Sequence, residues 1–135
     1  MSTRLNDRKE SKILFIDNMY QLVAHTWQYI AKLPKTTRFI FQQKIANIAT
    51  DGLTCIVRAN SIHIKSKEEW LRRKELFEDA IGYINSLEML LSIVQLKYKE
   101  YISDFGWEKW GEYISKEVKL LQGILKSDEL TFKKL

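Results

Sequence analysis

Ten lysines and arginines lie between residues 31 and 74, where only three acidic residues oppose them, so this stretch carries a formal charge of +7. The remainder has twelve basic and fourteen acidic residues, so the whole surplus of the +5 chain belongs to this stretch. Lysine and arginine side chains neutralise phosphates and release their counterions. A localised cationic surplus therefore indicates an anionic partner, for which a nucleic-acid backbone is well suited.

Seven of these cations are the candidate nucleic-acid-binding residues: Lys35, Arg38, Lys44, Arg58, Arg72, Arg73 and Lys74. In an antiparallel helical hairpin, Arg58 would lie near Arg72, and Lys35 and Arg38 would lie at the opposite end. The seven side chains would then form a stripe that could follow a phosphate backbone. The alternative interpretation is an ordinary solvated face, and for Arg38 a structural role in bracing the corner at Pro34.

Residues typical of enzymes and metal sites are sparse. Neither His25 nor His63 has an acidic residue three positions away, so the Glu-x-x-His pairs of di-iron bundles are missing from the sequence. Cys55 is the single cysteine, which removes the usual zinc patterns, and no glycine-rich phosphate loop is present. We therefore expect no enzymatic activity, no metal and no cofactor.

The four tryptophans could stack on nucleobases. They are Trp27, Trp70, Trp107 and Trp110. All four lie on apolar stripes of helical spacing, so packing in the core is the favoured interpretation.

Four stretches in which apolar residues recur at alternating steps of three and four predict amphipathic helices over roughly residues 8–32, 37–63, 67–102 and 104–126. Pro34 ends the first helix, because a proline disfavours helical geometry in the residue before it. The expected caps are Thr36 or Thr37, Ser66 with Glu69, and Ser103. Short connections favour a single domain over residues 1–135, an all-α up-down-up-down four-helix bundle with left-handed packing.

The expected core consists of the stripe residues of each helix. They are Ile13, Ile16, Tyr20, Val23, Trp27 and Ile30; Phe41, Ile45, Ile48, Gly52, Cys55, Ala59 and Ile62; Trp70, Phe77, Ala80, Ile84, Leu87, Leu91, Val94, Tyr98 and Tyr101; and Trp107, Trp110, Ile114, Val118, Leu121 and Leu125. Arg73 interrupts the third stripe near its start, where its long side chain is expected to reach solvent. The tail from Ser127 is expected to fray.

Apolar residues also lie off these stripes, among them Leu71, Ile93 and Leu96. They would need a second buried face, which predicts an oligomer or a partner complex. No run of about 18 apolar residues is present, so we expect no membrane span. Residues 1–12 lack the apolar centre of a signal peptide, and a lone cysteine suits a reducing compartment, so we expect a cytoplasmic location.

The corner from Leu33 to Phe39, followed by Gln43, Lys44 and Ile45, resembles that of the accessory variability proteins (Avd) of diversity-generating retroelements. Their corner has Pro-Lys, two small or polar residues and Arg-Phe, which corresponds to Pro34–Phe39. The stretch Arg72-Arg73-Lys74, followed by Ala80, Ile84, Leu87 and Leu91, is similar to the third helix of that family. The likeness spans roughly residues 14 to 125. Gln42 stands where the family commonly has glycine. Ser92 stands where a basic residue often follows the leucine pair, here Leu90-Leu91.

The resemblance implies a ring-like homopentamer of four-helix protomers that partners a reverse transcriptase and its template RNA and has no catalytic residues. The same group of bundles includes the proteins encoded in rRNA intervening sequences, which the segment Asn47–Gly52 partly matches. The alternative function is thus a structural bundle of that type, which docks a protein partner and has no specific nucleic-acid role.

Overall fold

A computed structural model of the chain describes the backbone of residues 3–134 and the side chains of residues 13–134. The four long helices are α1 (Thr3–Ile30), α2 (Gln43–Asn60), α3 (Lys67–Tyr98) and α4 (Asp104–Lys133). Three short segments accompany them, the 3-10 helices η1 (Lys35–Thr37) and η3 (Lys99–Tyr101) and the π-helix η2 (Arg38–Gln42). No strand occurs in residues 3–134, so the predicted all-α class is confirmed.

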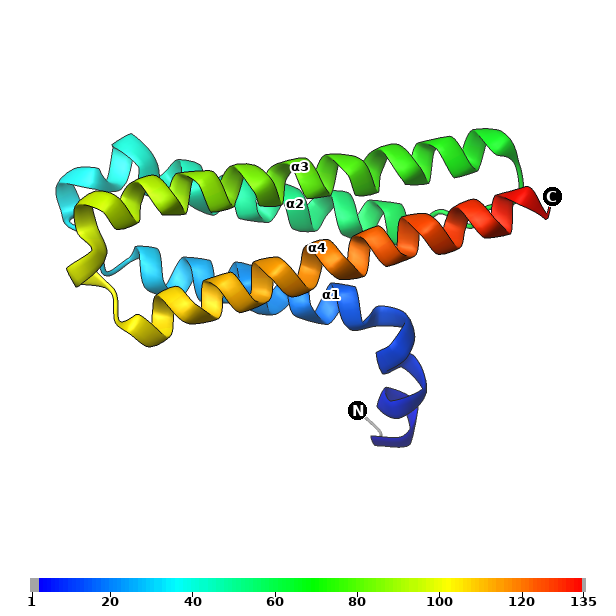
Figure 1. Cartoon of the computed structure of the whole chain (residues 1–135), viewed down its shortest axis with the longest axis horizontal. Coiled ribbons are helices and arrows are strands. Elements are labelled where there is room, and N and C mark those ends of the chain that lie inside the picture. The colour runs from blue at the N-terminus through cyan, green and yellow to red at the C-terminus, as the bar shows by residue number, and fades with distance from the viewer. Residues whose placement is uncertain (1–2, 135) are drawn as a thin grey trace.

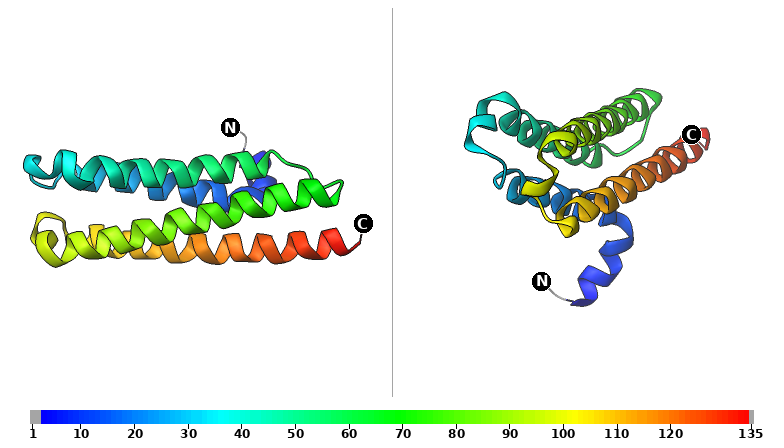
Figure 2. Two further views of the ribbon diagram at one scale, coloured as in Figure 1. Left: turned by 90° about the horizontal axis from the view of Figure 1, so that it is seen from above. Right: turned by 60° about the vertical axis from the view of Figure 1, so that its left-hand side comes forward.

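Successive helices run in opposite directions along one long axis (Figure 1). α1 packs against α2 and α4, and α3 packs against the same two helices. The first turns of α1 point away from the other helices (Figure 1, and the right-hand view of Figure 2). The chain is thus the four-helix bundle that the sequence predicts.

The buried face of α3 is the one that its apolar spacing predicts. Its buried residues are Phe77, Ala80, Ile84, Leu87, Leu91 and Val94. On the facing helix α2, Gly52 is buried where the helices approach, and a Cβ at this position would lie 3.0 Å from Met19 Cε and 3.4 Å from Tyr83 Cβ. A small residue on this face therefore lets α1, α2 and α3 pack closely, as a glycine in a buried helix face predicts.

The rotation of α1 differs from the prediction. Phe15, Met19 and Leu22 are buried, whereas Tyr20 and Trp27 are more than half exposed. The expected stripe at Tyr20 and Trp27 therefore lies outside the core, and the buried face is centred on neighbouring positions.

Polar contacts between α1 and α4 explain this rotation. The Nδ2 of Asn18 donates to the Tyr113 carbonyl and to Glu117 Oε1, both at 2.9 Å. The indole Nε1 of Trp110 donates to Thr26 Oγ1 at 2.9 Å. Asn18, Thr26 and Glu117 are all buried, so an apolar pattern could not identify the face on which they lie.

His25 adds another buried polar contact between α1 and α4, near the start of α4. Its Nε2 lies 2.8 Å from the Gly106 carbonyl oxygen, which accepts the Nε2 proton. Burial lowers the pKa of His25, so the neutral ring is favoured. A Cβ at position 106 would lie 2.8 Å from the Tyr29 ring, so glycine is required for this close approach.

The helix ends agree with the sequence at two caps and differ at the C-terminus. Ser66 Oγ accepts from the Glu69 amide at 3.3 Å, and Ser103 Oγ accepts from the Gly106 amide at 3.1 Å, which confirms both caps. The tail does not fray at Ser127, because α4 continues to Lys133. None of the helices in the described part of the chain is both long enough and apolar enough to cross a membrane.

Glu117 lies fully buried in α4, and one of its carboxyl oxygens, Oε2, has no hydrogen-bond partner among the described residues. Burial raises the pKa of this carboxyl from 4.5 to about 8, against a smaller opposite effect of the Asn18 hydrogen bond. The protonated acid is therefore the form that the core holds at neutral pH.

This raised pKa predicts the pH dependence of stability. The unfolded chain loses the Glu117 proton above about pH 4.5 and the folded chain only above about 8, so the free energy of unfolding should fall by up to about 1.4 kcal/mol per pH unit between these values. Below this window the effect is absent, and above it the cost is complete. Urea unfolding at several pH values should show this slope in the wild type and its loss in Glu117→Gln.

Glu108→Gln is the matched control, since Glu108 is an exposed glutamate of the same helix. It should keep the wild-type slope. Equal slopes for wild type and Glu117→Gln would contradict the assignment.

Candidate nucleic-acid interface

The seven predicted cations fall into two clusters at opposite ends of the α2–α3 hairpin. Lys35, Arg38 and Lys44 lie at the corner between α1 and α2. The other four, Arg58, Arg72, Arg73 and Lys74, lie where α2 ends and α3 begins. Lys44 and Arg58 are fourteen residues apart on α2, about 21 Å at the helical rise, with Asp51 midway between them. The expected stripe is therefore interrupted.

The corner is held by hydrogen bonds that converge on the Pro34 carbonyl. Thr37 donates to this oxygen from its amide at 3.0 Å and from its hydroxyl at 2.6 Å. Gln42 Nε2 donates to the same oxygen at 2.9 Å and to Thr37 Oγ1 at 2.7 Å. We call Pro34, Thr37 and Gln42 the corner clasp. The Thr37 hydroxyl thus turns back to Pro34 instead of capping the next helix, and the amide of Gln42 closes the clasp.

The corner clasp leaves the cations of the corner exposed. Lys35, Arg38 and Lys44 are exposed and belong to no ion pair among the described residues. The clasp is formed without the Arg38 side chain, so the bracing role considered for Arg38 is filled by Gln42 and Thr37. Residues 28–50 contain four cations, including Lys32, and no acidic residue. This part of the chain therefore offers positive charge that no acid close in sequence compensates.

A groove of about 420 Å³ lies beside these cations. Its walls come from the end of α1, from η2 and from the start of α2, and it is lined by Trp27, Ile30, Ala31, Arg38, Phe39, Gln42, Gln43 and Ala46. Trp27 is 54% exposed and Phe39 is 85% exposed. The interpretation of Trp27 as a core residue is therefore wrong, and sequence analysis missed the groove as a feature of the corner.

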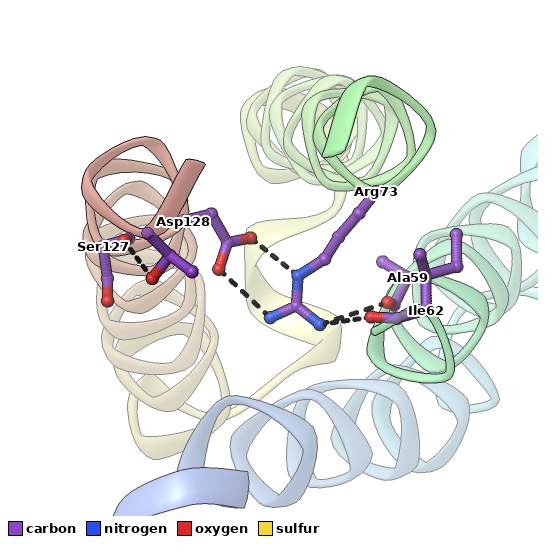
Figure 3. Close-up of polar contacts among 6 residues, drawn as sticks. Ala59, Ile62, Arg73, Ser127 and Asp128 are labelled. Carbon is purple, nitrogen blue, oxygen red and sulfur yellow. Dashed lines mark hydrogen bonds and ion pairs between the residues drawn. The ribbon is translucent and has the colours of Figure 1, made fainter. Parts of the chain in front are cut away.

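The cluster of Arg58, Arg72, Arg73 and Lys74, called the far cluster below, differs from the corner, because Arg73 points inward (Figure 3). Its Nε donates to Asp128 Oδ2 at 2.6 Å and its Nη2 to Asp128 Oδ1 at 3.4 Å. Its Nη1 donates to the carbonyls of Ile62 at 3.1 Å and Ala59 at 3.4 Å. The side chain is only 17% exposed, so the expectation that it reaches solvent is wrong. Arg73 joins α3 to the ends of α2 and α4 and is not available to a phosphate.

The remaining cations of the far cluster have mixed surroundings. Arg58 and Arg72 line one shallow groove, as the hairpin predicts, but Glu75 and Asp79 line it with them. The Lys74 ammonium lies 5.2 Å from the centre of the Trp70 ring. Trp70 in turn stacks on Phe132 at 4.3 Å, so it braces α3 against α4. The positive charge of Arg58 and Arg72 is thus partly offset by neighbouring acidic residues, and the Lys74 ammonium lies near the Trp70 ring.

The described residues hold no group of histidine, cysteine and carboxylate side chains that could bind a metal ion. The chemistry of the corner is therefore that of cations, aromatic faces and amides. Such a site can bind a flat, anionic ligand.

The Arg73–Asp128 pair predicts a large loss of stability when it is broken. Arg73→Met should lower the free energy of unfolding by about 2–4 kcal/mol, because it leaves the Asp128 carboxylate and two carbonyls without their donor. Urea unfolding measures this loss. The matched control is Lys133→Met, which breaks the exposed Lys133–Glu129 pair and should cost less than about 0.5 kcal/mol. Similar small losses in both variants would show that the Arg73 network is not a structural tie.

Comparison of the chain with protein-family models, with curated proteins and with solved structures finds no match.

Proposed function

We propose that this protein is a non-enzymatic accessory protein that binds nucleic acid through the corner between α1 and α2. One observation carries the proposal. Lys35, Arg38 and Lys44 are exposed without ion-pair partners among the described residues, in a stretch from 28 to 50 that has no acidic residue. Such cations gain free energy by replacing the counterions of phosphates.

The mechanism is positioning. The corner clasp holds η2 in one conformation, so Arg38 presents its guanidinium from a fixed backbone. An arginine can hold a phosphate through two parallel hydrogen bonds, and a lysine acts as a point charge. Arg58, Arg72 and Lys74 form a weaker second contact region at the far end, and Arg73 is left out of the interface.

The partner follows from the resemblance at Leu33–Phe39. In a diversity-generating retroelement the protein would hold template RNA near the reverse transcriptase, as a ring-like homo-oligomer with five protomers as the expected number. A stripe of exposed apolar side chains on α3 supports the contact between protomers. It consists of Met89, Ile93 and Leu96, spaced by four and three residues on one helix face.

The second candidate function is a structural bundle that docks one protein partner and binds no nucleic acid. The same α3 stripe favours it, because exposed apolar patches mark protein–protein contact sites. The two functions differ in what they require of the corner cations, which the following experiment measures.

Charge reversal at the corner should weaken RNA binding. Lys35→Glu combined with Arg38→Glu should reduce affinity for a short single-stranded RNA more than about tenfold at low salt, and should lower the slope of log K against log salt by about 1.4. Fluorescence anisotropy over a range of salt concentrations measures both quantities.

The control reverses two exposed lysines of α4, Lys119→Glu with Lys126→Glu, and changes the net charge equally. It should keep most of the affinity. Equal losses in the two variants would mean that only net charge matters, and an absence of RNA binding at low salt would overturn the proposal in favour of the docking bundle.

Self-association should depend on the α3 stripe. Ile93→Glu with Leu96→Glu places two charges in a surface that must be desolvated in an interface, so the assembled protein should dissociate into monomers. Light scattering after size-exclusion chromatography measures the mass. Ser115→Glu with Gln122→Glu, two exposed polar positions of α4 outside the stripe, should leave the mass unchanged. An oligomer that survives the double change would place the interface elsewhere.

A further inference from the structure

We infer that the groove beside Trp27 is a subsite for one unpaired nucleobase of a single strand, whose phosphate is held by the corner cations. The inference rests on the proposed nucleic-acid binding and names the part of the ligand that this groove takes. The groove combines two exposed aromatic side chains, Trp27 and Phe39, with the guanidinium of Arg38. Its volume of about 420 Å³ lies in the range of small-ligand sites.

Trp27 differs from the other three tryptophans in its surroundings. Trp110 is buried and donates to Thr26, Trp107 donates to the Lys99 carbonyl, and Trp70 stacks on Phe132. Trp27 has no aromatic partner and no hydrogen bond from its indole among the described residues, and more than half of its surface is in water. A large aromatic surface left in water is available to a flat partner.

The lining favours a base over a larger apolar ligand. Ala31 and Ala46 are small and keep the groove open, and Ile30 supplies an apolar floor. Gln42 donates from its amide nitrogen to the corner clasp, and its amide oxygen has no partner in the described part of the chain. An amide oxygen beside an aromatic wall can accept from the amino edge of a splayed base.

Charge decides between a nucleotide and an apolar peptide. None of the described residues that line the groove is a carboxylate, and no acid lies between residues 28 and 50. The segments around the groove carry four cations, Lys32, Lys35, Arg38 and Lys44. An apolar peptide would gain nothing from these four cations, whereas a strand offers one phosphate for each base. A base inside a duplex is stacked and cannot enter the groove, so the ligand is single-stranded.

The site is also preorganised. Phe39 and Arg38 lie on the π-helix η2, a form of helix frequent at functional sites. The corner clasp fixes the turn that leads into η2 and the residue that ends it. A ligand that enters the groove therefore meets walls that are already in place, which lowers the entropic cost of binding.

The test compares a short single-stranded RNA with an abasic strand of the same length and charge. Wild type should bind the strand with bases about tenfold more tightly, as expected for stacking of one base. Trp27→Leu should abolish this preference and keep the affinity for the abasic strand, which reports the cations alone. Ala46→Leu, which fills the groove and leaves Trp27 in place, should have the same effect.

Tyr20→Leu is the matched control, because Tyr20 is a half-exposed aromatic residue of the same helix outside the groove lining. It should keep the preference, and thermal unfolding should show that each variant folds. Equal binding of both strands by wild type, or a preference that survives both groove variants, would overturn the subsite and leave the proposed function standing. If neither strand binds, the proposed function fails as well. Binding of an acidic peptide that Trp27→Leu abolishes would assign the groove to a protein partner and overturn the inference.

Discussion

The rotation of α1 is the constraint on which the rest of the molecule depends, and polar contacts with α4 set it. Asn18 with Glu117, Thr26 with Trp110, and His25 with the Gly106 carbonyl lie along one side of α1. Each pair is buried, so a rotation of α1 that separated them would leave polar groups without partners inside the protein. An apolar contact could tolerate such a rotation at small cost, whereas these pairs specify one arrangement. With that face held inward, Trp27 must point outward.

This constraint explains what sequence analysis could and could not predict. The buried face of α3 followed from spacing because its buried residues, from Phe77 to Val94, are all apolar. Ser66 and Ser103 were predictable as caps because a cap is a local interaction of a few residues. The buried face of α1 could not be predicted in this way. The residues that fix its rotation are polar, and their partners lie more than eighty residues away in the sequence.

A partner that is distant in the sequence also limits the prediction of which cations are free. A count of cations along the chain treats Arg73 and Arg38 alike, but fifty-five residues separate Arg73 from the Asp128 that neutralises it. Arg38 has no such partner in the described structure, and the stretch from 28 to 50 contains no acid at all. The absence of acidic residues over a local stretch was therefore a better indicator of free charge than the density of cations. It favours the corner over the Arg72-Arg73-Lys74 run.

The corner clasp links the orientation of α1 to the position of Arg38. It ties Pro34, which follows the end of α1, to Gln42 at the end of the η2 segment that carries Arg38. Gln42 contributes here what a glycine could not, a side-chain amide that reaches the Pro34 carbonyl. The groove that results is lined, within the described part of the chain, by apolar, aromatic and amide side chains and by the Arg38 guanidinium. In the function proposed above, such a groove would hold a strand by salt-sensitive contacts and by stacking, as a protein that acts by positioning requires.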